Sequence, residues 1–481
     1  MPNNTNIPAD DVLYASRGKI YPKRVSGTFR RLKWTAMAVL LAIYYLAPWI
    51  RWDRGPNAPD QAILIDMPAR RFYFFFIELW PQEVYYITGV LIAAGIGLFL
   101  SNALVGRAWC GYACPQTVWT DLYIHVERWV EGDRSARMRL DKSPWSLGKI
   151  RKRIIKHAIW ILIAVATGGA WVFYFADAPT LMGQLFTFDA PFAAYLWIGI
   201  FTATTYTLGG LAREQVCTYM CPWPRIQAAM TDEEALNVSY RTDRGEPRGI
   251  HKKGTTWEGR GDCIDCKACV NVCPMGIDIR DGAQLECIHC ALCIDACDEI
   301  MDKIERPRGL IGYDNDRRIA ARAAGEPQPS LRYIRPRTVL YAGMIAIVGI
   351  VMVVSLFTRD DFDITVQHDR NPHFVQLSSG DIRNAYTVKI SNKKAVERSY
   401  RLTLPDLPDA QLASIGLAEA PLENGLIVTV PPDDLRSVRV TVTAPRMTAG
   451  QDGSVPVHFQ IYEYESRKTD NASDFFKGPT R

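Results

Sequence analysis

The sequence predicts a multi-domain membrane protein with an α-helical transmembrane bundle, a cysteine-rich α+β insert and a C-terminal all-β sandwich. Three observations predict this fold class. The chain of 481 residues contains five apolar stretches, two dense runs of cysteine between the fourth and fifth stretches, and a tail in which apolar and polar residues alternate. A chain of this length has room for several domains.

The five apolar stretches have about the twenty residues that a bilayer core requires. The predicted spans are residues 34–50, 84–106, 158–176, 192–211 and 338–357. More than thirty residues precede the first span, and no small-x-small cleavage pattern follows it. We therefore interpret the first span as a retained anchor and not as a cleaved signal peptide.

Lysine and arginine collect in three segments, which lie before the first span, between the second and third spans, and before the fifth. They are Arg24, Arg30, Arg31 and Lys33, then Arg134, Arg137, Arg139, Lys149, Arg151, Lys152, Arg153 and Lys156, then Arg332, Arg335 and Arg337. Because basic loops stay in the cytoplasm, five crossings place the N-terminal segment 1–33 and the insert 212–337 inside and the tail 358–481 outside. The expected location is a bacterial inner membrane with the tail in the periplasm. The net charge of +5 is then mostly a topology signal and gives no reason to expect nucleic acid as a partner.

The insert carries eight of the twelve cysteines in two runs of identical spacing, C-x2-C-x2-C-x3-C. This is the spacing of a bacterial two-cluster ferredoxin, in which the fourth cysteine of each run binds the other cluster. We therefore expect a ferredoxin-like insert with two [4Fe–4S] clusters, one on Cys263, Cys266, Cys269 and Cys297 and the other on Cys287, Cys290, Cys293 and Cys273. Zinc ribbons also use CxxC pairs, but a longer knuckle separates their pairs. Pro274 follows the first run and Asp298 follows the second, a departure that removes no ligand.

The other four cysteines form two CxxxCP motifs just past the second and fourth spans, Cys110 with Cys114 and Cys217 with Cys221. The matched positions indicate a repeated two-span unit that delivers one motif twice to the same membrane face. Residues four apart share a helix face, and the following proline suits the first position of a new helix. The second cysteine of each motif would then lie beside a helix N-terminus, where the dipole favours thiolate. Soft thiolates favour Cu(I) or a redox-active dithiol, with buried structural cysteine as the alternative interpretation.

Three further side chains near the cysteines are candidates for metal binding. Met220 could add a thioether, but packing is its more common role. His125 and His289 are expected to face solvent or to be hydrogen-bonded. The sequence has no transmembrane histidine pair for haem b, no GxGxxG and no CxxCH. We therefore expect electrons to come from another protein or from quinol. The aromatic run 72–76 is interpreted as an interfacial belt or a partly inserted segment, with a quinone pocket as the alternative.

The tail alternates apolar and polar residues in several short segments separated by turns. They are residues 364–367, 386–390, 426–430, 438–442 and 457–462. This pattern predicts an antiparallel sandwich of immunoglobulin-like kind. The tail contains no cysteine. Its role is either to bind an exported partner or to serve as a structural appendage.

Together these features make the chain resemble the cbb3-type cytochrome c oxidase accessory protein family, the CcoG, FixG and RdxA proteins. The resemblance rests on the spans, the motifs at 109–115 and 217–223, the insert 263–297 and the exported sandwich. It implies a role in maturing the copper-containing oxidase, as a Cu(II) reductase that supplies Cu(I). Under this resemblance the copper or redox site would be Cys110, Cys114, Cys217 and Cys221, and the eight insert cysteines would be the electron input.

The implied partners are the membrane, a cbb3-type oxidase or its copper-assembly factors, and an electron donor that the sequence does not identify. The residues by themselves predict an electron path that ends at soft ligands. Two alternatives remain open. One is a quinol-linked electron-transfer subunit, since related proteins of nitrate and nitrous-oxide respiration share the arrangement. The other is a non-catalytic scaffold that docks the oxidase through residues 358–481.

Overall fold

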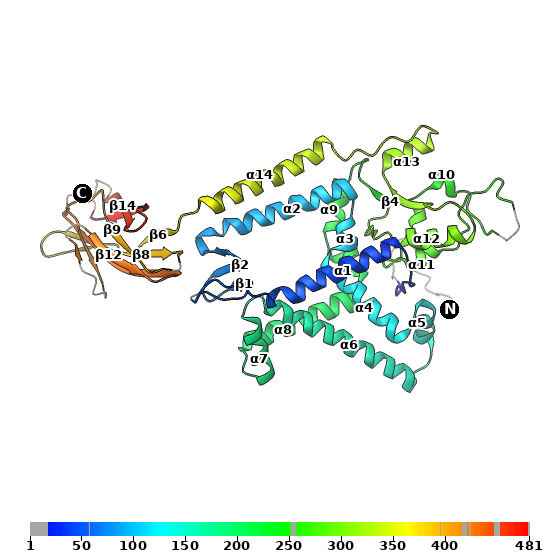
Figure 1. Ribbon diagram of the computed structural model, residues 1–481, viewed down its shortest axis with the longest axis horizontal. Coiled ribbons are helices and arrows are strands. Elements are labelled where there is room, and N and C mark those ends of the chain that lie inside the picture. The colour runs from blue at the N-terminus through cyan, green and yellow to red at the C-terminus, as the bar shows by residue number, and fades with distance from the viewer. Residues whose placement is uncertain are drawn as a thin grey trace. The chain divides into compact units, whose positions relative to one another are not determined.

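The computed structural model describes residues 18–56, 58–251, 256–394, 396–415, 421–422, 425–446 and 453–479. The first seventeen residues of the predicted N-terminal segment 1–33 lie outside this range. The chain forms two compact units, Met1–Arg51 with Gln61–Met352 and Trp52–Asp60 with Val353–Arg481. Most of the helices and the cysteine-rich insert belong to the first unit, and the β-rich tail belongs to the second (Figure 1).

Four helical segments in the described part of the chain are long and apolar enough to cross a membrane, Thr28–Trp49, Pro81–Val105, Leu147–Val172 and Pro336–Thr358. Their main helices are α1 (Thr28–Leu46), α2 (Tyr85–Val105), α6 (Leu147–Val172) and α14 (Pro336–Thr358). The short 3-10 helices η2 (Ala47–Trp49) and η3 (Pro81–Glu83) extend the first two segments. These apolar helices agree with a membrane protein.

The predicted fourth span falls on α8 (Phe192–Thr205) and the π-helical segment η4 (Tyr206–Ala212). A preceding helix, α7 (Ala178–Thr187), meets this segment at a bend of 93°. If the bent pair is one span, the described residues contain up to five spans. The predicted spans leave residues 177–191 without an element, so α7 is an addition to the predicted helices.

Two of the helices begin earlier than hydropathy predicts, because their first turns are polar. The side-chain oxygen of Ser146 accepts a hydrogen bond from the amide of Lys149, at 3.3 Å, and caps α6 well before residue 158. The carboxylate of Asp295 accepts the amides of Phe29 and Arg30, at 3.2 and 2.7 Å, at the start of α1. Capping therefore extends both helices into basic sequence that a hydropathy window excludes.

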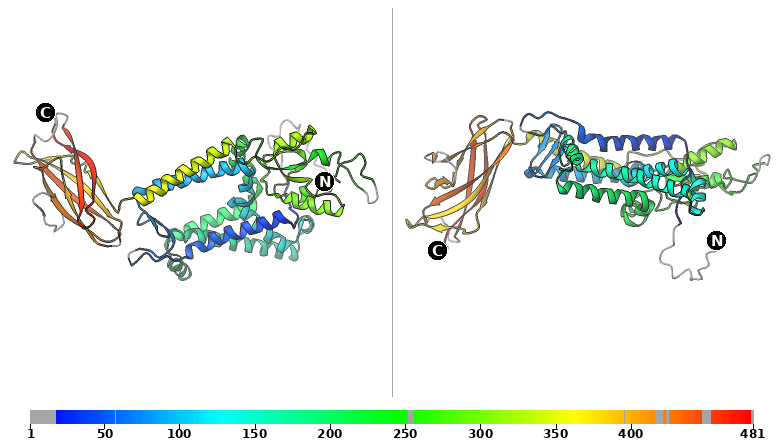
Figure 2. Two further views of the ribbon diagram at one scale, coloured as in Figure 1. Left: turned by 45° about the horizontal axis from the view of Figure 1, so that its top comes forward. Right: turned by 90° about the horizontal axis from the view of Figure 1, so that it is seen from below.

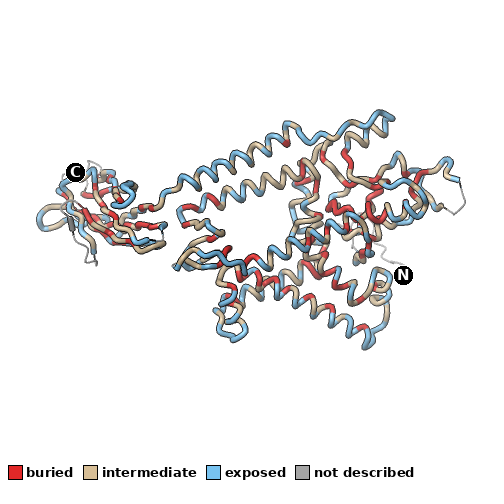
Figure 3. Tube along the Cα trace, in the orientation of Figure 1, coloured by how far each residue is buried: buried red, intermediate tan, exposed pale blue. Residues whose placement is uncertain are grey.

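Helices α2 and α14 lie side by side (Figures 1 and 2). Their aromatic rings Phe99 and Tyr341 have centroids 6.3 Å apart. A Cβ atom at Gly89 would lie 2.5 Å from the sulfur of Met352, so glycine permits the close approach. The most apolar window of α14 has no buried residue, and only 11% of that of α2 is buried (Figure 3). Such exposed apolar surface fits helices solvated by lipid.

The aromatic run 72–76 contributes to a small antiparallel sheet, which the sequence analysis did not predict. Its strands are β1 (Ile63–Asp66), β2 (Arg71–Phe74) and β3 (Ile77–Leu79), in that order. Tyr73 is buried in the sheet, whereas Phe74 and Phe76 are exposed. Part of the run therefore packs in a folded element, and part faces outward as a belt would.

The insert holds two strands and two short helices around its cysteines. Strand β4 (Asn237–Tyr240) pairs antiparallel with β5 (Ile311–Asp314). Helix α11 (Ala268–Val272) carries the third cysteine of the first run, Cys269, and α12 (Leu292–Lys303) carries the last two of the second run. The 3-10 turn η6 (Ile279–Asp281) lies between them in sequence. This is a ferredoxin-like α+β arrangement, with α10 (Thr242–Gly245) and α13 (Asp316–Ala323) at its edges.

The tail consists of two antiparallel sheets. One has the order β10-β13-β8-β6, with β7 also paired to β8, and the other has the order β11-β12-β9-β14-β15. Their bounds are β6 (Phe362–His368), β7 (Val375–Gln376), β8 (Ile382–Asn392), β9 (Arg398–Thr403), β10 (Gln411–Ser414), β11 (Pro421–Leu422), β12 (Gly425–Val430), β13 (Asp434–Ala444), β14 (Ser454–Glu463) and β15 (Thr469–Lys477). Side chains from both sheets, such as Tyr386, Val440, Tyr400 and Phe459, share one buried core. The five predicted strand segments lie in β6, β8, β12, β13 and β14, and the other strands were not predicted.

Candidate iron–sulfur and thiol site

The eight insert cysteines line two neighbouring cavities. One is lined by Cys263, Cys266, Cys269 and Cys297. The other is lined by Cys273, Cys287, Cys290 and Cys293, and Cys269 also reaches it. The two groups of four are those into which the spacing divides the cysteines, because the last cysteine of each run lies beside the first three of the other. The shared residue Cys269 shows that the two cavities adjoin.

The backbone turns in the same way in both cysteine runs. Asp265 and Lys267 in the first run have φ angles of 53° and 56°, and His289 and Ala291 at the same positions of the second have 51° and 60°. Each left-handed residue other than glycine costs about 1–2 kcal/mol. These paired turns wrap the first three cysteines of each run around one cavity, so the local strain accompanies the arrangement that a cluster needs.

The lining of the two cavities fits iron–sulfur clusters in its chemistry, because four cysteine sulfurs face each one. Apolar side chains such as Leu310 and Ile277 complete their walls. Burial raises the pKa of the Cys269 and Cys287 thiols to about 11, so metal binding at these sulfurs would release protons. Among the described residues, no three His, Cys, Asp or Glu side chains converge on a position for a single metal ion. A four-iron cluster is held at its corners, and its ligands are therefore more widely spaced than those of one ion.

The first CxxxCP motif lies at a break between two helices. Helix α3 (Ala108–Tyr112) carries Cys110, and Cys114 is the N-cap residue of α4 (Pro115–Glu131). Pro115 occupies the first turn of α4, as predicted. The hydroxyl of Thr117 donates to the carbonyl oxygens of Cys110 and Cys114, at 2.7 and 3.0 Å. The four-residue spacing predicted that the two cysteines share one face of a helix. This prediction is wrong for the first motif, because the helix is broken between them.

The second CxxxCP motif has a different backbone. Cys217 lies in the π-helical turn η5 (Val216–Met220), and Cys221 ends that turn before α9 (Trp223–Met230). Cys221 is exposed, and Met220 is 63% exposed. Met220 is therefore not among the buried side chains around Cys217, which argues against a thioether ligand on the buried side of the motif.

The two motifs come together although about a hundred residues separate them. Burial and then the nearby thiols of Cys114 and Cys217 raise the pKa of Cys110 to about 12, and Arg107 opposes this shift. Burial, then Cys114 and Cys221, raise the pKa of Cys217 to about 12. The thiol of Cys110 donates to the side-chain oxygen of Gln227, with the sulfur 3.5 Å from it. The two motifs therefore lie close enough for the thiols of one to act electrostatically on those of the other.

The first motif packs directly on the loop of the second cysteine run. A Cβ atom at Gly111 would lie 2.7 Å from the carbonyl oxygen of Ile288 and 3.1 Å from the amide nitrogen of Cys290, so only glycine permits this approach. Next to it, the hydroxyl of Tyr112 donates to the carbonyl oxygen of Cys290 at 3.1 Å. The second motif has Thr218 at the position of Gly111. The two motifs thus share cysteines and tyrosine but not the contact surface.

Cys110 and Cys217 also pack against one hydrophobic cluster of the insert. Its buried members include Val272, Met275 and Ile288, together with Cys290. The partly buried Cys273 and Cys287 pack against the same cluster. The thiols of Cys110, Cys114, Cys217 and Cys221 are called the membrane-edge thiols below. Through Cys110 and Cys217 they adjoin the cavity of Cys273, Cys287, Cys290 and Cys293.

Arg107 and His289 reinforce this junction, although no sequence motif includes Arg107. The amide of Arg107 donates to Nδ1 of His289 at 3.0 Å. Burial, and then the charge of Arg107, lower the pKa of His289 to about 3, so the ring is neutral and can accept this bond. The guanidinium donates to the carbonyl oxygens of Leu285, Cys287 and Pro224. His289 was expected either to face solvent or to be hydrogen-bonded, and it is hydrogen-bonded. The sequence feature that could have drawn attention to Arg107 is its position three residues before Cys110.

Two cysteine-lined cavities in a ferredoxin-like insert, joined to long apolar helices, define a membrane iron–sulfur redox protein. Comparison with protein families agrees with this class. The "4Fe-4S dicluster domain" family matches residues 212–316, and the "4Fe-4S binding domain" family matches residues 86–134. The family described as "IG-like fold at C-terminal of FixG" matches residues 352–479.

Individual relatives cover nearly the whole chain. The "Nitrogen fixation protein FixG" of Rhizobium meliloti (strain 1021) is 56% identical, over 90% of this chain and 88% of its own. Protein RdxB of Cereibacter sphaeroides is 56% identical over 91% of both chains, and protein RdxA of the same organism is 52% identical over 90% of this chain and 91% of its own. The chain belongs to the FixG/RdxA family, as its motifs predicted.

Proposed function

We propose that the protein passes electrons from two [4Fe–4S] clusters to Cu(II) at the thiols of Cys110, Cys114, Cys217 and Cys221, which would draw together around the ion when it binds. The Cu(I) product would serve the maturation of a cbb3-type cytochrome c oxidase. The observation that carries this proposal is the direct contact between the first CxxxCP motif and the loop of Cys290. A short path through packed protein connects the cluster ligands to soft sulfur ligands.

The proposed electron path runs through three sites in order. The cavity of Cys263, Cys266, Cys269 and Cys297 adjoins that of Cys273, Cys287, Cys290 and Cys293. The second cavity adjoins the four membrane-edge thiols. When bound, the clusters supply low-potential electrons one at a time. One electron given to Cu(II) yields Cu(I) and leaves the cluster oxidised by one electron. An external electron-donor protein or quinol must then reduce the cluster again.

The membrane-edge thiols would favour the reduced product. Thiolate sulfur is a soft ligand that prefers Cu(I). A site that binds Cu(I) more tightly than Cu(II) shifts the copper couple towards reduction. Three of the four cysteines are partly buried and Cys221 is exposed, so the site has one side open to an incoming ion. Arg107 lies beside Cys110 and would offset part of the negative charge of the thiolates.

For the topology, we propose five spans in a bacterial inner membrane, with residues 1–33 and 212–337 in the cytoplasm and 358–481 in the periplasm. Contacts at alternating helix ends support this. The start of α1 is bonded to Asp295 of the insert, and Asn102 at the end of α2 donates to the carbonyl oxygen of Gln227, at 3.2 Å. Arg335, just before α14, donates to the carbonyl oxygen of Ala103. These helix ends lie on the insert's side, as an alternating path requires.

A second candidate follows from one comparison. The "4Fe-4S binding domain" family covers residues 86–134, which include Cys110 and Cys114. The four membrane-edge cysteines would then hold a third cluster that continues the electron path, in place of a substrate copper ion. Iron content separates the candidates, because two four-iron clusters contain about eight irons and three contain about twelve.

The test is a double variant, Cys110→Ser with Cys114→Ser, in the anaerobically purified full chain. The dithionite-reduced variant should keep both ferredoxin cluster signals in EPR but reduce Cu(II) at the background rate, measured with a Cu(I)-specific chelator. Met220→Leu, in the second motif but exposed, is the matched control and should reduce Cu(II) normally. If the double variant reduces and binds copper like wild type, the assembly scaffold or the quinol-linked subunit is preferred.

The same preparation tests the alternatives. If iron falls from about twelve to about eight per chain in the double variant, the four thiols hold a third cluster. Reduction of the clusters by quinol in membranes would favour the quinol-linked subunit. If an oxidase assembles normally when cluster ligands are replaced, the protein is a scaffold and not a reductase.

A further inference from the structure

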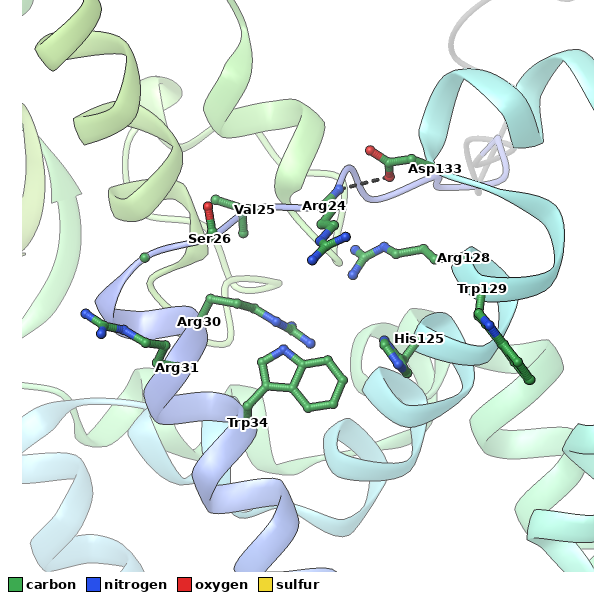
Figure 4. Close-up of a pocket in the computed structure, with 11 residues that line it drawn as sticks. Arg24, Val25, Ser26, Arg30, Arg31, Trp34, His125, Arg128, Trp129 and Asp133 are labelled. Atoms are coloured by element: carbon green, nitrogen blue, oxygen red, sulfur yellow. Dashed lines mark hydrogen bonds between the residues drawn. The ribbon is translucent and has the colours of Figure 1, made fainter.

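A large cavity lies apart from the thiols, between the start of α1 and helix α4 (Figure 4). Its volume is about 830 Å³. Small-molecule sites typically have about 300–1,000 Å³. The cavity is lined by Arg24, Val25, Ser26, Gly27, Arg30, Arg31, Trp34, His125, Arg128, Trp129 and Asp133. None of these residues is part of the electron path described above.

Positive charge dominates this cavity. Four arginines line it, and Asp133 is the only carboxylate among the lining residues. One oxygen of Asp133 already accepts the amide of Arg24, at 2.9 Å. His125 adds no opposing charge, and its ring stands edge-on to Trp34, with centroids 4.6 Å apart. Asp121, outside the lining, pairs with Arg30 at 3.0 Å, so two carboxylates face four arginines and the lining keeps an excess of positive charge.

Arg30 is the clearest sign of a missing partner. Its side chain points into the cavity (Figure 4), and the residue is only 5% exposed. One terminal nitrogen donates to Asp121 at 3.0 Å, but the other is buried without a hydrogen-bond partner. A buried guanidinium nitrogen that makes no hydrogen bond costs free energy. An anion in the cavity would satisfy it.

Arg128 faces the same cavity from α4. Its terminal nitrogen donates to the carbonyl oxygens of Pro22 and Lys23, at 3.2 and 3.3 Å, while Nε is buried without a partner. Burial, and then the charge of Arg30, lower the pKa of Arg128 to about 10. The two guanidinium groups therefore repel each other across the cavity, and an anion between them would relieve that repulsion.

The N-terminal amides of α1 do not account for the site. The carboxylate of Asp295 already accepts the amides of Phe29 and Arg30. A Cβ atom at Gly27 would collide with that carboxylate, at 2.3 Å from its carbon. The anion-binding capacity of the cavity thus resides in the arginine side chains.

The position of the cavity indicates which anion it suits. It lies where α1, a candidate membrane span, begins. On that same part of the helix Leu32 is 53% exposed, and across the cavity Trp129 is 76% exposed. Exposed tryptophan beside arginine is typical of the membrane–water interface. A free phosphate ion would fill only a small part of the volume, whereas a phospholipid headgroup with its glycerol would fill far more of it.

We propose that this cavity binds the phosphate of an anionic phospholipid headgroup, with Arg30 and Arg128 as its principal donors. Guanidinium groups bind phosphate through paired, charge-assisted hydrogen bonds. Basic pockets between membrane helices on the cytoplasmic side recognise such headgroups. The bound lipid would link α1 to α4 at the level where α1 also contacts Asp295 of the insert.

The test measures lipid binding to the full-length protein in detergent by native mass spectrometry. The probes are phosphatidylglycerol, phosphatidylcholine and inorganic phosphate. The variant is Arg24→Gln with Arg128→Gln, because Arg30 pairs with Asp121 and its loss could disturb folding. The matched control is Arg151→Gln with Lys152→Gln, two exposed basic residues at the start of α6 that do not line the cavity. Cluster absorbance checks that each protein is folded.

Wild type should bind phosphatidylglycerol more tightly than phosphatidylcholine. The Arg24 and Arg128 variant should lose about tenfold in affinity for phosphatidylglycerol, and the control should lose none. Equal binding of the two lipids by wild type would overturn the proposal, and so would an unchanged affinity in the cavity variant. If inorganic phosphate displaces phosphatidylglycerol at equal concentration, the site is one for a free ion and the lipid assignment is wrong.

Discussion

The hydroxyl group of Tyr112 donates a hydrogen bond to the carbonyl oxygen of Cys290, with 3.1 Å between the two oxygens. Tyr112 is the central residue of the first CxxxC motif, and Cys290 is the second of the four cysteines in the second ferredoxin run. The two residues are 178 positions apart. This bond therefore joins the membrane-edge thiols to the loop that lines the nearer cluster cavity.

Replacing Tyr112 by Phe should loosen this junction without removing a ligand. A neutral hydrogen bond contributes about 1 kcal/mol, which is roughly a fivefold change in the fraction of docked motif. We expect normal iron content and a severalfold slower Cu(II) reduction in stopped-flow experiments. Tyr219→Phe, at the same position of the second motif and 51% exposed, is the control. Equal slowing in both variants would show that the contact with Cys290 has no special role.

Gly111→Ala should separate the motif from the cluster loop more strongly. The added methyl group would lie 2.7 Å from the carbonyl oxygen of Ile288, a backbone atom that cannot move aside alone. We expect both cluster signals in EPR to remain and Cu(II) reduction to fall by more than in Tyr112→Phe. Thr218→Ala in the second motif is the control, because residue 218 already carries a Cβ atom and the substitution adds no atom to the backbone. Wild-type kinetics in Gly111→Ala would contradict the proposed path.

Cys273→Ser should damage the cluster otherwise held by Cys287, Cys290 and Cys293. The reason is that Cys273 lines their cavity although it belongs to the other run in sequence. Iron analysis and EPR should show selective loss of one cluster signal. Cys297→Ser should remove the other signal instead. If Cys297→Ser, and not Cys273→Ser, removes the signal of the cluster on Cys287, each run binds its own cluster.

Reporter fusions should test the proposed orientation. An enzyme that is active only in the periplasm should be silent when fused after Gly325, in the insert, and active when fused after Arg481. The basis is the distribution of Lys and Arg between alternate loops. A cytoplasmic reporter should give the reverse pattern and serves as the control. Periplasmic activity at Gly325 would overturn the orientation.

The stability of the tail should depend on pH through Asp363. Burial, and then the charge of Asp470, raise the pKa of Asp363 to about 6, from an ordinary value of 3.8. The folded tail therefore holds this proton more tightly than the unfolded chain. Its stabilising contribution is complete below pH 3.8 and is lost as the pH rises through about 6. Since the side chain is partly exposed, solvent screening limits the effect to about 1 kcal/mol.

Hydrogen exchange in the full chain can measure this dependence. After correction for intrinsic exchange rates, amides of β6 and β15 should be less protected at pH 8 than at pH 5. Asp363→Asn should remove the difference, because an amide does not titrate. Asp381→Asn, just before β8 and partly exposed, is the control and should leave the difference intact. Equal protection of wild type at both pH values would contradict the prediction.

The sequence by itself determined the features that depend on local pattern. The spacing of the cysteines divided them into the two groups that line the two cavities. Hydropathy located the long apolar helices, and alternation located five strands of the tail. Strand β15 escaped detection because its polar and apolar residues do not alternate, whereas β9 was missed although Tyr400 and Leu402 alternate with polar residues. Capping by Ser146 and Asp295 then moved helix starts beyond what hydropathy can detect.

The tertiary structure alone decided how these elements meet. The sequence could not show that Cys110 and Cys217 pack against one hydrophobic cluster of the insert, nor that Gly111 and Tyr112 contact the loop of Cys290. It also could not show that Arg30 and Arg128 face one cavity. Such contacts join residues far apart in the chain, and they depend on the volumes and directions of side chains that only the packed fold brings together. Periodicity and spacing report what a segment can form, whereas its partners follow from the shape of the whole molecule.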